Sequence, residues 1–222
     1  MSEENKKTLA AYDQVAQKYL DNTIAHDAMR PEHAREKQAQ LNEKIRKAFA
    51  PLPAGGKVLE IGAADGENSK FLESLGYEVT ASDVAPAFLK AIEAKGLKAA
   101  KFNVLEDDFP DKYAGVLCWR VFVHFTADDI KLALQRVYEA LEPGGRFMFN
   151  VIDRETHDTD SQWVDFTDEY RLGAERFYAY YREDDLRKIV DATDFKVADY
   201  WKEKGGHNDW LVYVLEKQDG KD

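Results

Sequence analysis

The sequence has little of what marks secreted, disulfide-stabilised or membrane proteins. Its 222 residues include a single cysteine, Cys118, so a disulfide within the chain and a cysteine-based metal site are excluded, and we expect no metal. No run of about 18 apolar residues occurs, as a transmembrane helix would need, and residues 1–20 lack the apolar core of a signal peptide. These absences predict a cytoplasmic protein with no membrane partner.

A basic excess is also missing. The chain carries 31 lysines and arginines against 42 aspartates and glutamates, which gives a net charge of -11. Such a chain repels phosphate backbones, so nucleic acid is not an expected partner. Hydrophobic residues, at 44%, are too frequent for a disordered chain. The length favours one domain, residues 1–222, over two.

Residues 1–53 have the pattern of two helices. Leu9, Tyr12 and Val15 recur at the three- and four-residue spacing of one helical face, and residues 41–49 repeat the pattern. Pro31 lies between the two stretches. Proline removes a backbone donor and biases the residue before it away from helix, so it separates the two predicted helices. We expect these helices to cap the domain.

Beyond the turn at residues 54–56, short β-rich runs alternate with helical stretches, which predicts an α/β fold with a parallel sheet. We expect strands at 57–61, 77–82, 98–104, 115–119 and 146–152, and helices at 68–75, 86–95 and 127–141. Residues 182–217 predict a helix, 183–192, and an antiparallel hairpin of strands 195–202 and 210–216. The run from Thr126 to Asp129 resembles a capping box that opens the helix at 127.

Residues 153–181 break this alternation, since they are polar, rich in Trp and Tyr, and longer than most strand-to-helix connections. Within them, residues 176–181 alternate like a strand and place Arg176, Tyr178 and Tyr180 on one face. We interpret 153–181 as a cap over an acceptor, because aromatic side chains provide rigid binding area. Its candidate substrate residues are Arg154, Trp163, Tyr178 and Tyr180, with Tyr170 beside them. The alternative is a small hydrophobic core under a long loop.

The stretch from Val58 to Gly66 predicts a buried strand that runs into a turn of small residues, where backbone can approach a ligand closely. The spacing of Gly62 and Gly66 does not match the dinucleotide or P-loop patterns. Glu60 would also oppose a pyrophosphate. Asp83, 23 residues after Glu60, can bind the two hydroxyls of a ribose. A nucleoside with positive charge and no phosphate fits, and S-adenosylmethionine is such a compound.

These residues resemble the motifs of class I S-adenosylmethionine-dependent methyltransferases. Residues 58–66 are similar to the first motif, [DE]-x-G-x-G-x-G, with Ala64 in place of its middle glycine, and Asp83 matches the ribose-binding acid. Residues 113–125 are similar to the F-D-V-V-x-x-x-x-x-L-H-H-L segment, with Ala114 where an acid is usual. Residues 141–145 match the L-x-P-G-G turn, and residues 12–19 resemble the Y-D-x-x-A-x-x-Y helix.

The resemblance implies a Rossmann-like sheet of seven strands, in the order 3-2-1-4-5-7-6, with the last strand antiparallel and helices on both faces. Residues 54–152 would form the cofactor-binding half. The bound cofactor would be S-adenosylmethionine, and the product S-adenosylhomocysteine. The expected cofactor-binding residues are Tyr12, Tyr19, Glu60, Gly62, Ala63, Ala64, Gly66, Asp83, Val84, Asn103, Val104 and Cys118.

Three residues at or just after the end of the fourth strand have competing interpretations. His124 is the candidate catalytic residue, as a neutral imidazole that accepts a proton, although a histidine bonded to backbone is the alternative. Arg120 is a candidate clamp for a substrate carboxylate, or a surface ion pair. Cys118 follows Leu117 instead of the proline that precedes a nucleophilic cysteine in cytosine-methylating relatives, so we expect an inert thiol.

We therefore expect an enzyme that transfers a methyl group to an oxygen or nitrogen atom of a small molecule or a peptide end. It would act as a monomer or homodimer. One alternative is a cofactor-binding partner subunit without catalysis, in which the cap is a protein interface. Another is an NAD-dependent oxidoreductase on a similar sheet.

Overall fold

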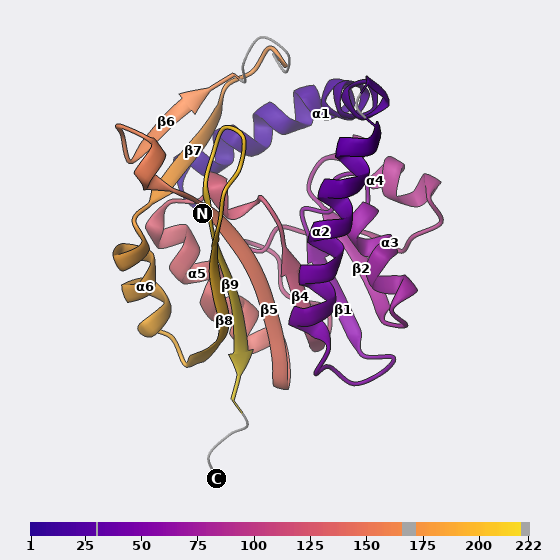
Figure 1. Cartoon of the computed structure of the whole chain (residues 1–222), viewed down its shortest axis with the longest axis vertical. Coiled ribbons are helices and arrows are strands. Elements are labelled where there is room, and N and C mark those ends of the chain that lie inside the picture. Colours follow the sequence, from indigo (N-terminus) through magenta and orange to yellow (C-terminus); the bar gives the residue numbers. More distant parts are fainter. Residues whose placement is uncertain (30, 166–171, 219–222) are drawn as a thin grey trace.

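Two helices precede the sheet, as the spacing predicts. The protein was analysed as a computed structural model, which describes residues 1–29, 31–165 and 172–218. Helix α1 (Glu3–Met29) crosses the upper edge of the sheet, and α2 (Pro31–Phe49) descends along one face (Figure 1). Pro31 is the first residue of α2, the helical position at which proline is best tolerated. No described helix is apolar over a length that could cross a membrane.

The central sheet confirms the predicted order. Parallel strands run β3-β2-β1-β4-β5, then β9 pairs antiparallel with β5, and β8 pairs antiparallel with β9. These strands are β1 (Lys57–Ile61), β2 (Glu78–Asp83), β3 (Ala99–Lys101), β4 (Tyr113–Cys118), β5 (Leu141–Asp153), β8 (Phe195–Glu203) and β9 (Trp210–Lys217). Because the parallel strands share one direction, their carboxyl ends form a single edge, over which α1 lies.

Helices cover both faces of the sheet. They are α3 (Glu67–Ser74), α4 (Pro86–Ala94), α5 (Ala127–Ala140) and α6 (Glu183–Asp191). On one face, Phe49 of α2 and Leu72 of α3 pack on Val58, Leu117 and Met148. On the other, residues of α5 and α6 pack on alternate residues of the same strands. The strands are therefore buried on both sides, which explains their nearly continuous apolar sequence.

The segment at 153–181 adds a second, smaller hairpin. It contains a 3-10 turn, η2 (Arg154–Thr156), and the antiparallel strands β6 (Ser161–Val164) and β7 (Arg176–Tyr181). Strand β7 pairs with β5 at Ile152 and Asp153, beyond Phe149, the last β5 residue that pairs with β4. The described sheet thus has nine strands, where seven were expected. Tyr170 lies outside the described residues.

The alternation predicted for 176–181 is confirmed, and both faces of β7 are buried. Phe177 and Tyr181 join the large core under α5, whereas Tyr178 and Tyr180 pack with Val123 and Ile152. Strand β7 is therefore packed on both faces and is not part of an open loop.

Most predicted strand boundaries differ from the structure by two residues or fewer, and two differ by more. Strand β3 ends at Lys101 and not at 104, because Asn103 forms a turn in which its Oδ1 accepts the Leu105 N–H at 3.0 Å. Strand β5 begins at Leu141, before the Pro-Gly-Gly run and not after it. The pairing of β5 with β4 continues across this run with a shift in register, since Tyr113 pairs with Leu141 and Gly115 with Arg146.

Thr126 offers a test of how α5 begins. Its hydroxyl accepts the Asp129 N–H at 3.3 Å, and the Asp129 carboxylate accepts the Thr126 N–H at 3.4 Å, which is the predicted capping box. Thr126→Ala should lower the free energy of unfolding by about 1 kcal/mol, measured by urea denaturation, because a helix N–H loses its acceptor. Thr126→Ser keeps the oxygen and should match the parent protein. Equal stability of the alanine variant would contradict this role.

Candidate functional site

The turn after β1 is built from left-handed backbone. Gly62, Ala64 and Gly66 have φ values of 71, 49 and 80 degrees. A β-carbon on Gly62 would lie 2.3 Å from Val121 Cγ2, so glycine is required there both for its conformation and for the close approach of Val121. Ala64 holds the left-handed conformation despite its side chain, at a cost of about 1 kcal/mol.

Asp83 ties this turn to the end of β2. Its Oδ1 accepts the N–H groups of Val84 and Ala85 at 2.7 and 3.2 Å, and its Oδ2 accepts the Ala64 N–H at 3.0 Å. Burial raises the pKa of Asp83, and these three hydrogen bonds oppose the rise. A carboxylate offers about four acceptor positions, so one remains on Oδ2 for a ligand.

Glu60, at the end of β1, is a buried carboxyl that organises the start of α3. Its oxygens accept from Asn68 Nδ2 at 2.9 Å and from Ser69 Oγ at 2.5 Å. Burial raises the pKa of Glu60 to about 7, although the two hydrogen bonds lower it. Both carboxyl oxygens therefore already accept a hydrogen bond from the protein. A ligand could bond to them only through their remaining lone pairs.

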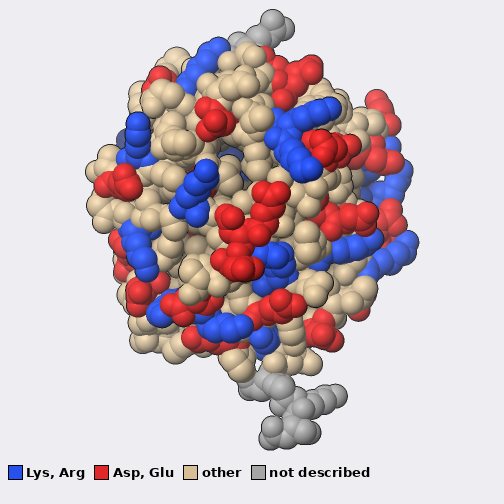
Figure 2. Space-filling view, turned by 180° about the vertical axis from the view of Figure 1, so that it is seen from behind, with Lys and Arg blue, Asp and Glu red and all other residues tan. Residues whose placement is uncertain are grey.

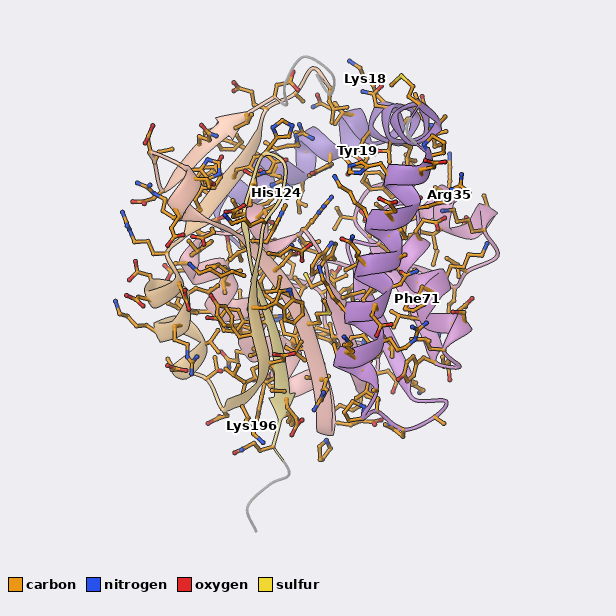
Figure 3. All side chains as sticks on the ribbon, in the orientation of Figure 1. Lys18, Tyr19, Arg35, Phe71, His124 and Lys196 are labelled. Atoms are coloured by element: carbon orange, nitrogen blue, oxygen red, sulfur yellow. The ribbon has the colours of Figure 1, made fainter. Side chains whose placement is uncertain are left out.

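Helix α1 brings aromatic side chains onto the turns after β1 and β2. Tyr12 and Tyr19 pack against Phe88 of α4, with ring centroids 6.2 and 5.7 Å away, and both cluster with Ala64 and Ala85. Tyr19 and His124 lie at the edge of the sheet that α1 crosses, whereas Lys196 lies at the opposite end (Figure 3). The helix predicted to cap the cofactor thus contacts both of the turns predicted to bind it.

His124 lies in a 3-10 turn, η1 (Phe122–His124), and both of its ring nitrogens have partners. Nδ1 is 2.7 Å from the Phe177 carbonyl, which can only accept, so Nδ1 donates and Nε2 accepts from the Tyr12 hydroxyl at 2.9 Å. Burial, aided by the positive charge of Arg176, lowers the pKa of His124 to about 4. The imidazole is therefore neutral at pH 7.

Two of the predicted cofactor-binding residues have side chains buried in the core, and a third lies at the edge with partners within the protein. Val104 and Cys118 are buried in the core under α5, and burial raises the pKa of the Cys118 thiol well above its usual value. The inert thiol is thus the interpretation that the structure favours. Asn103 lies at the edge, but its amide oxygen accepts from Leu105 and its amide nitrogen contacts Glu106.

Of the predicted substrate residues, Tyr178 packs against His124, with ring centroids 4.6 Å apart. Tyr180 stacks on His157 at 3.8 Å, and Arg154 Nε donates to Asp160 at 2.7 Å, so both serve contacts within residues 153–181. Trp163 is 38% exposed on β6. The structure therefore brings Tyr178 to the site and leaves Trp163 at the surface.

Arg176 is a residue of the site that the sequence reasoning did not select as a binding residue. It is fully buried, and its guanidinium carbon lies 5.5 Å from the centre of the Tyr12 ring, while its Nη2 is 4.0 Å from Asp165. A cation over an aromatic face is attractive, and more so when buried. The alternation that placed Arg176 beside Tyr178 was the available signal.

A depression of about 430 Å³ lined by Phe109, Lys112 and Arg136 lies by the loop that leads into β4, at the amino ends of the strands. Among the described residues no group of three histidines, cysteines or acids could hold a metal ion. Acidic and basic side chains intermingle on the face shown in Figure 2.

Glu60 makes the stability of the protein depend on pH. The folded chain keeps the Glu60 proton up to about pH 7, whereas the unfolded chain releases it near pH 4.5. Between these values the unfolded state binds fewer protons, so stability falls as pH rises. Glu60→Gln should remove up to roughly 3 kcal/mol of that fall, measured by denaturation at pH 5 and pH 7.5. Parallel pH profiles for the two proteins would contradict this assignment.

Known proteins resemble the chain in sequence. A methyltransferase domain family model matches residues 32–200. A ubiquinone biosynthesis O-methyltransferase of Xylella fastidiosa is 27% identical over 165 residues, 65% of this chain and 65% of that protein. One of Idiomarina loihiensis is 28% identical over 108 residues, 45% of this chain and 44% of that protein. The chain thus spans between 44% and 65% of the length of these relatives.

Solved structures resemble it in fold. An S-adenosylmethionine-dependent methyltransferase from Clostridium acetobutylicum superposes with a TM-score of 0.66 at 16% identity, over 90% of this chain and 100% of that chain. The 1,6-didemethyltoxoflavin-N1-methyltransferase of Burkholderia thailandensis gives 0.60 at 22% identity, over 91% and 90%. At these identities the structures establish the shared fold, and the family model, which matches more than half of the sequence, establishes that the chain belongs to the methyltransferase domain family.

Proposed function

We propose that the chain transfers a methyl group from S-adenosylmethionine to an oxygen or nitrogen atom of a small molecule or a peptide end. The observation that supports this most is the left-handed turn after β1, which Asp83 joins to β2 and which α1 covers with Tyr12 and Tyr19. The relatives' names fit, since they include O-methyltransferases and an N1-methyltransferase with bound S-adenosylhomocysteine. A cytoplasmic location and a monomeric or homodimeric state stay predictions.

The residues of the edge suit this cofactor. Asp83 keeps an acceptor position for a ribose hydroxyl, Val84 follows it for adenine, and the backbone of residues 62–66 faces the same edge for the methionine end. The buried carboxylate of Asp83, joined by Glu60 once the pH exceeds its pKa of about 7, favours a ligand that carries positive charge over a pyrophosphate. When bound, S-adenosylmethionine supplies a methyl group on a positively charged sulfur.

The protein's part in the reaction is mainly to position and to exclude water. Methyl transfer requires the acceptor atom in line with the methyl group, and holding that geometry is itself a large catalytic effect. An efficient general base has a pKa near the working pH, and His124, with a pKa of about 4, does not. We propose that His124 instead holds Tyr12, and with it α1, over the cofactor.

The function is tested by incubating the protein with S-adenosylmethionine and a panel of small carboxylates, amines, phenols and peptides, and measuring S-adenosylhomocysteine formation. Asp83→Asn should weaken S-adenosylhomocysteine binding about tenfold, by calorimetry, because a charged acceptor for ribose is lost. Asp128→Asn, at an exposed position of α5, removes the same charge as a control. Cofactor binding without turnover would favour a partner subunit, and binding of NAD instead would indicate an oxidoreductase.

The role of His124 is separable from general-base catalysis. We expect Tyr12→Phe and His124→Asn each to raise the KM for S-adenosylmethionine several-fold, because the bond that anchors α1 is lost, with little change in kcat. The ratio of kcat between the parent protein and the His124 variant should not change from pH 6 to 9. A fall of about 10²-fold in kcat for the His124 variant alone would identify it as a base and overturn the positioning role.

A further inference from the structure

Arg120, directly after β4, has an unusual backbone. Its φ of 62 degrees is left-handed, which is rare for a residue with a long side chain. Its N–H donates to Asn150 Oδ1 at 2.7 Å, and its guanidinium carbon lies 5.2 Å from the Trp210 ring. Backbone outliers of this kind concentrate at functional sites, and this one holds an exposed arginine at the carboxyl edge of the sheet.

Asn150 supplies a second, independent observation. Its side chain is fully buried, and because Oδ1 accepts from Arg120, the other end of the amide is the nitrogen, Nδ2. Nδ2 has no hydrogen-bond acceptor among the described residues. Nearly all buried polar side-chain atoms in proteins have a partner. A donor left over beside the site therefore points to an oxygen that a ligand brings.

Asn150 faces the side of the sheet that α2 covers, as does Met148 two residues before it. Strand pairing places Asn150 of β5, Val212 of β9 and Trp201 of β8 in one row across the sheet. On β9, Trp210 lies two residues from Val212, toward the carboxyl edge of the parallel strands. The indole N–H of Trp201 is also buried without an acceptor in the described chain. This row thus combines N–H donors with aromatic faces.

The row lies beside the proposed methyl-transfer site. Val121 follows Arg120 in the chain and occupies the space that a side chain at position 62 would fill. The side chain of Val121, next to Arg120 in the chain, therefore contacts the turn predicted to hold the methionine end of the cofactor. A group bound by Arg120 and Asn150 would place the body of its molecule next to that turn.

We propose, on the basis of the function proposed above, that the acceptor is an aromatic or heteroaromatic carboxylate. Its carboxylate accepts hydrogen bonds from the Arg120 guanidinium and from Asn150 Nδ2, and its ring lies against Trp210. The planar fork of an arginine matches the two oxygens of a carboxylate, and every free group identified at this point is a donor. Asn150 is thus a specificity-determining residue, and Arg120 its charged partner.

Paired probes test the proposal without knowledge of the natural acceptor. Hydroxy- and aminobenzoates, indole carboxylates and pyridine carboxylates are titrated by calorimetry into protein saturated with S-adenosylhomocysteine, each beside its own neutral carboxamide. At least one carboxylate should bind at least tenfold more tightly than its carboxamide, because only the carboxylate gains a charged partner in Arg120.

Variants then assign the preference to the two residues. Arg120→Gln, at an exposed side chain, should reduce the carboxylate preference to about twofold or less. Asn150→Asp keeps an oxygen for the Arg120 N–H but replaces the donor by an acceptor, so it should weaken carboxylate binding more than tenfold and carboxamide binding much less. Arg187→Gln, at a half-exposed arginine on α6, is the control for loss of one positive charge and should have no effect.

The outcomes separate this proposal from the function on which it rests. Failure of the unmodified protein to bind S-adenosylhomocysteine overturns the proposed function. Normal S-adenosylhomocysteine binding with no bound carboxylate, with equal binding of each pair, or with a carboxylate preference that survives Arg120→Gln overturns the acceptor proposal alone. Tighter binding of aromatic phosphates than of carboxylates also overturns it, since the partner would then be a different anion.

Discussion

The backbone conformation of the turn after β1 is the constraint on which the site depends. Left-handed residues at Gly62, Ala64 and Gly66 fold the chain back so sharply that the Ala64 N–H reaches Asp83 on the neighbouring strand. The missing side chain at Gly62 makes room for Val121, so the segment after β4 can pack on the same turn. One short stretch therefore sets the relative positions of the ends of β1, β2 and β4, and with them Gly62, Asp83 and Arg120.

Helix α1 covers the carboxyl edge of the sheet. Its contacts link the side predicted to bind the cofactor with the hairpin at 153–181. Tyr12 bonds His124 while packing on Phe88, and Thr8 Oγ1 accepts the N–H of Phe177 at 3.0 Å. The same helix thus touches the cofactor side, through α4, and the 153–181 hairpin, through β7. A displacement of α1 would open both sides at once, which suits the proposed methyl transfer between two substrates away from water.

Much of this could be predicted from the sequence, because local rules determine it. The alternation of strands and helices, the turn at Gly62 and the cap at Thr126 follow from short-range patterns. What could not be predicted depends on contacts between distant segments. The bond between Tyr12 and His124 joins residues 112 positions apart. Periodicity showed which residues share a strand face but not which layer covers it. The resemblance placed Cys118 among the cofactor-binding residues, whereas its side chain is buried in the core, as expected for an inert thiol.

The burial of Cys118 has a practical consequence. As the single thiol of the chain, enclosed between the sheet and α5 and kept protonated there, it is shielded from alkylating reagents while the fold is intact. Alkylation of the native protein would then proceed only as fast as the core opens. The rate of Cys118 alkylation would therefore report how often the core opens, without a label being introduced. Any compound that binds at the site and stabilises the folded state would lower that rate.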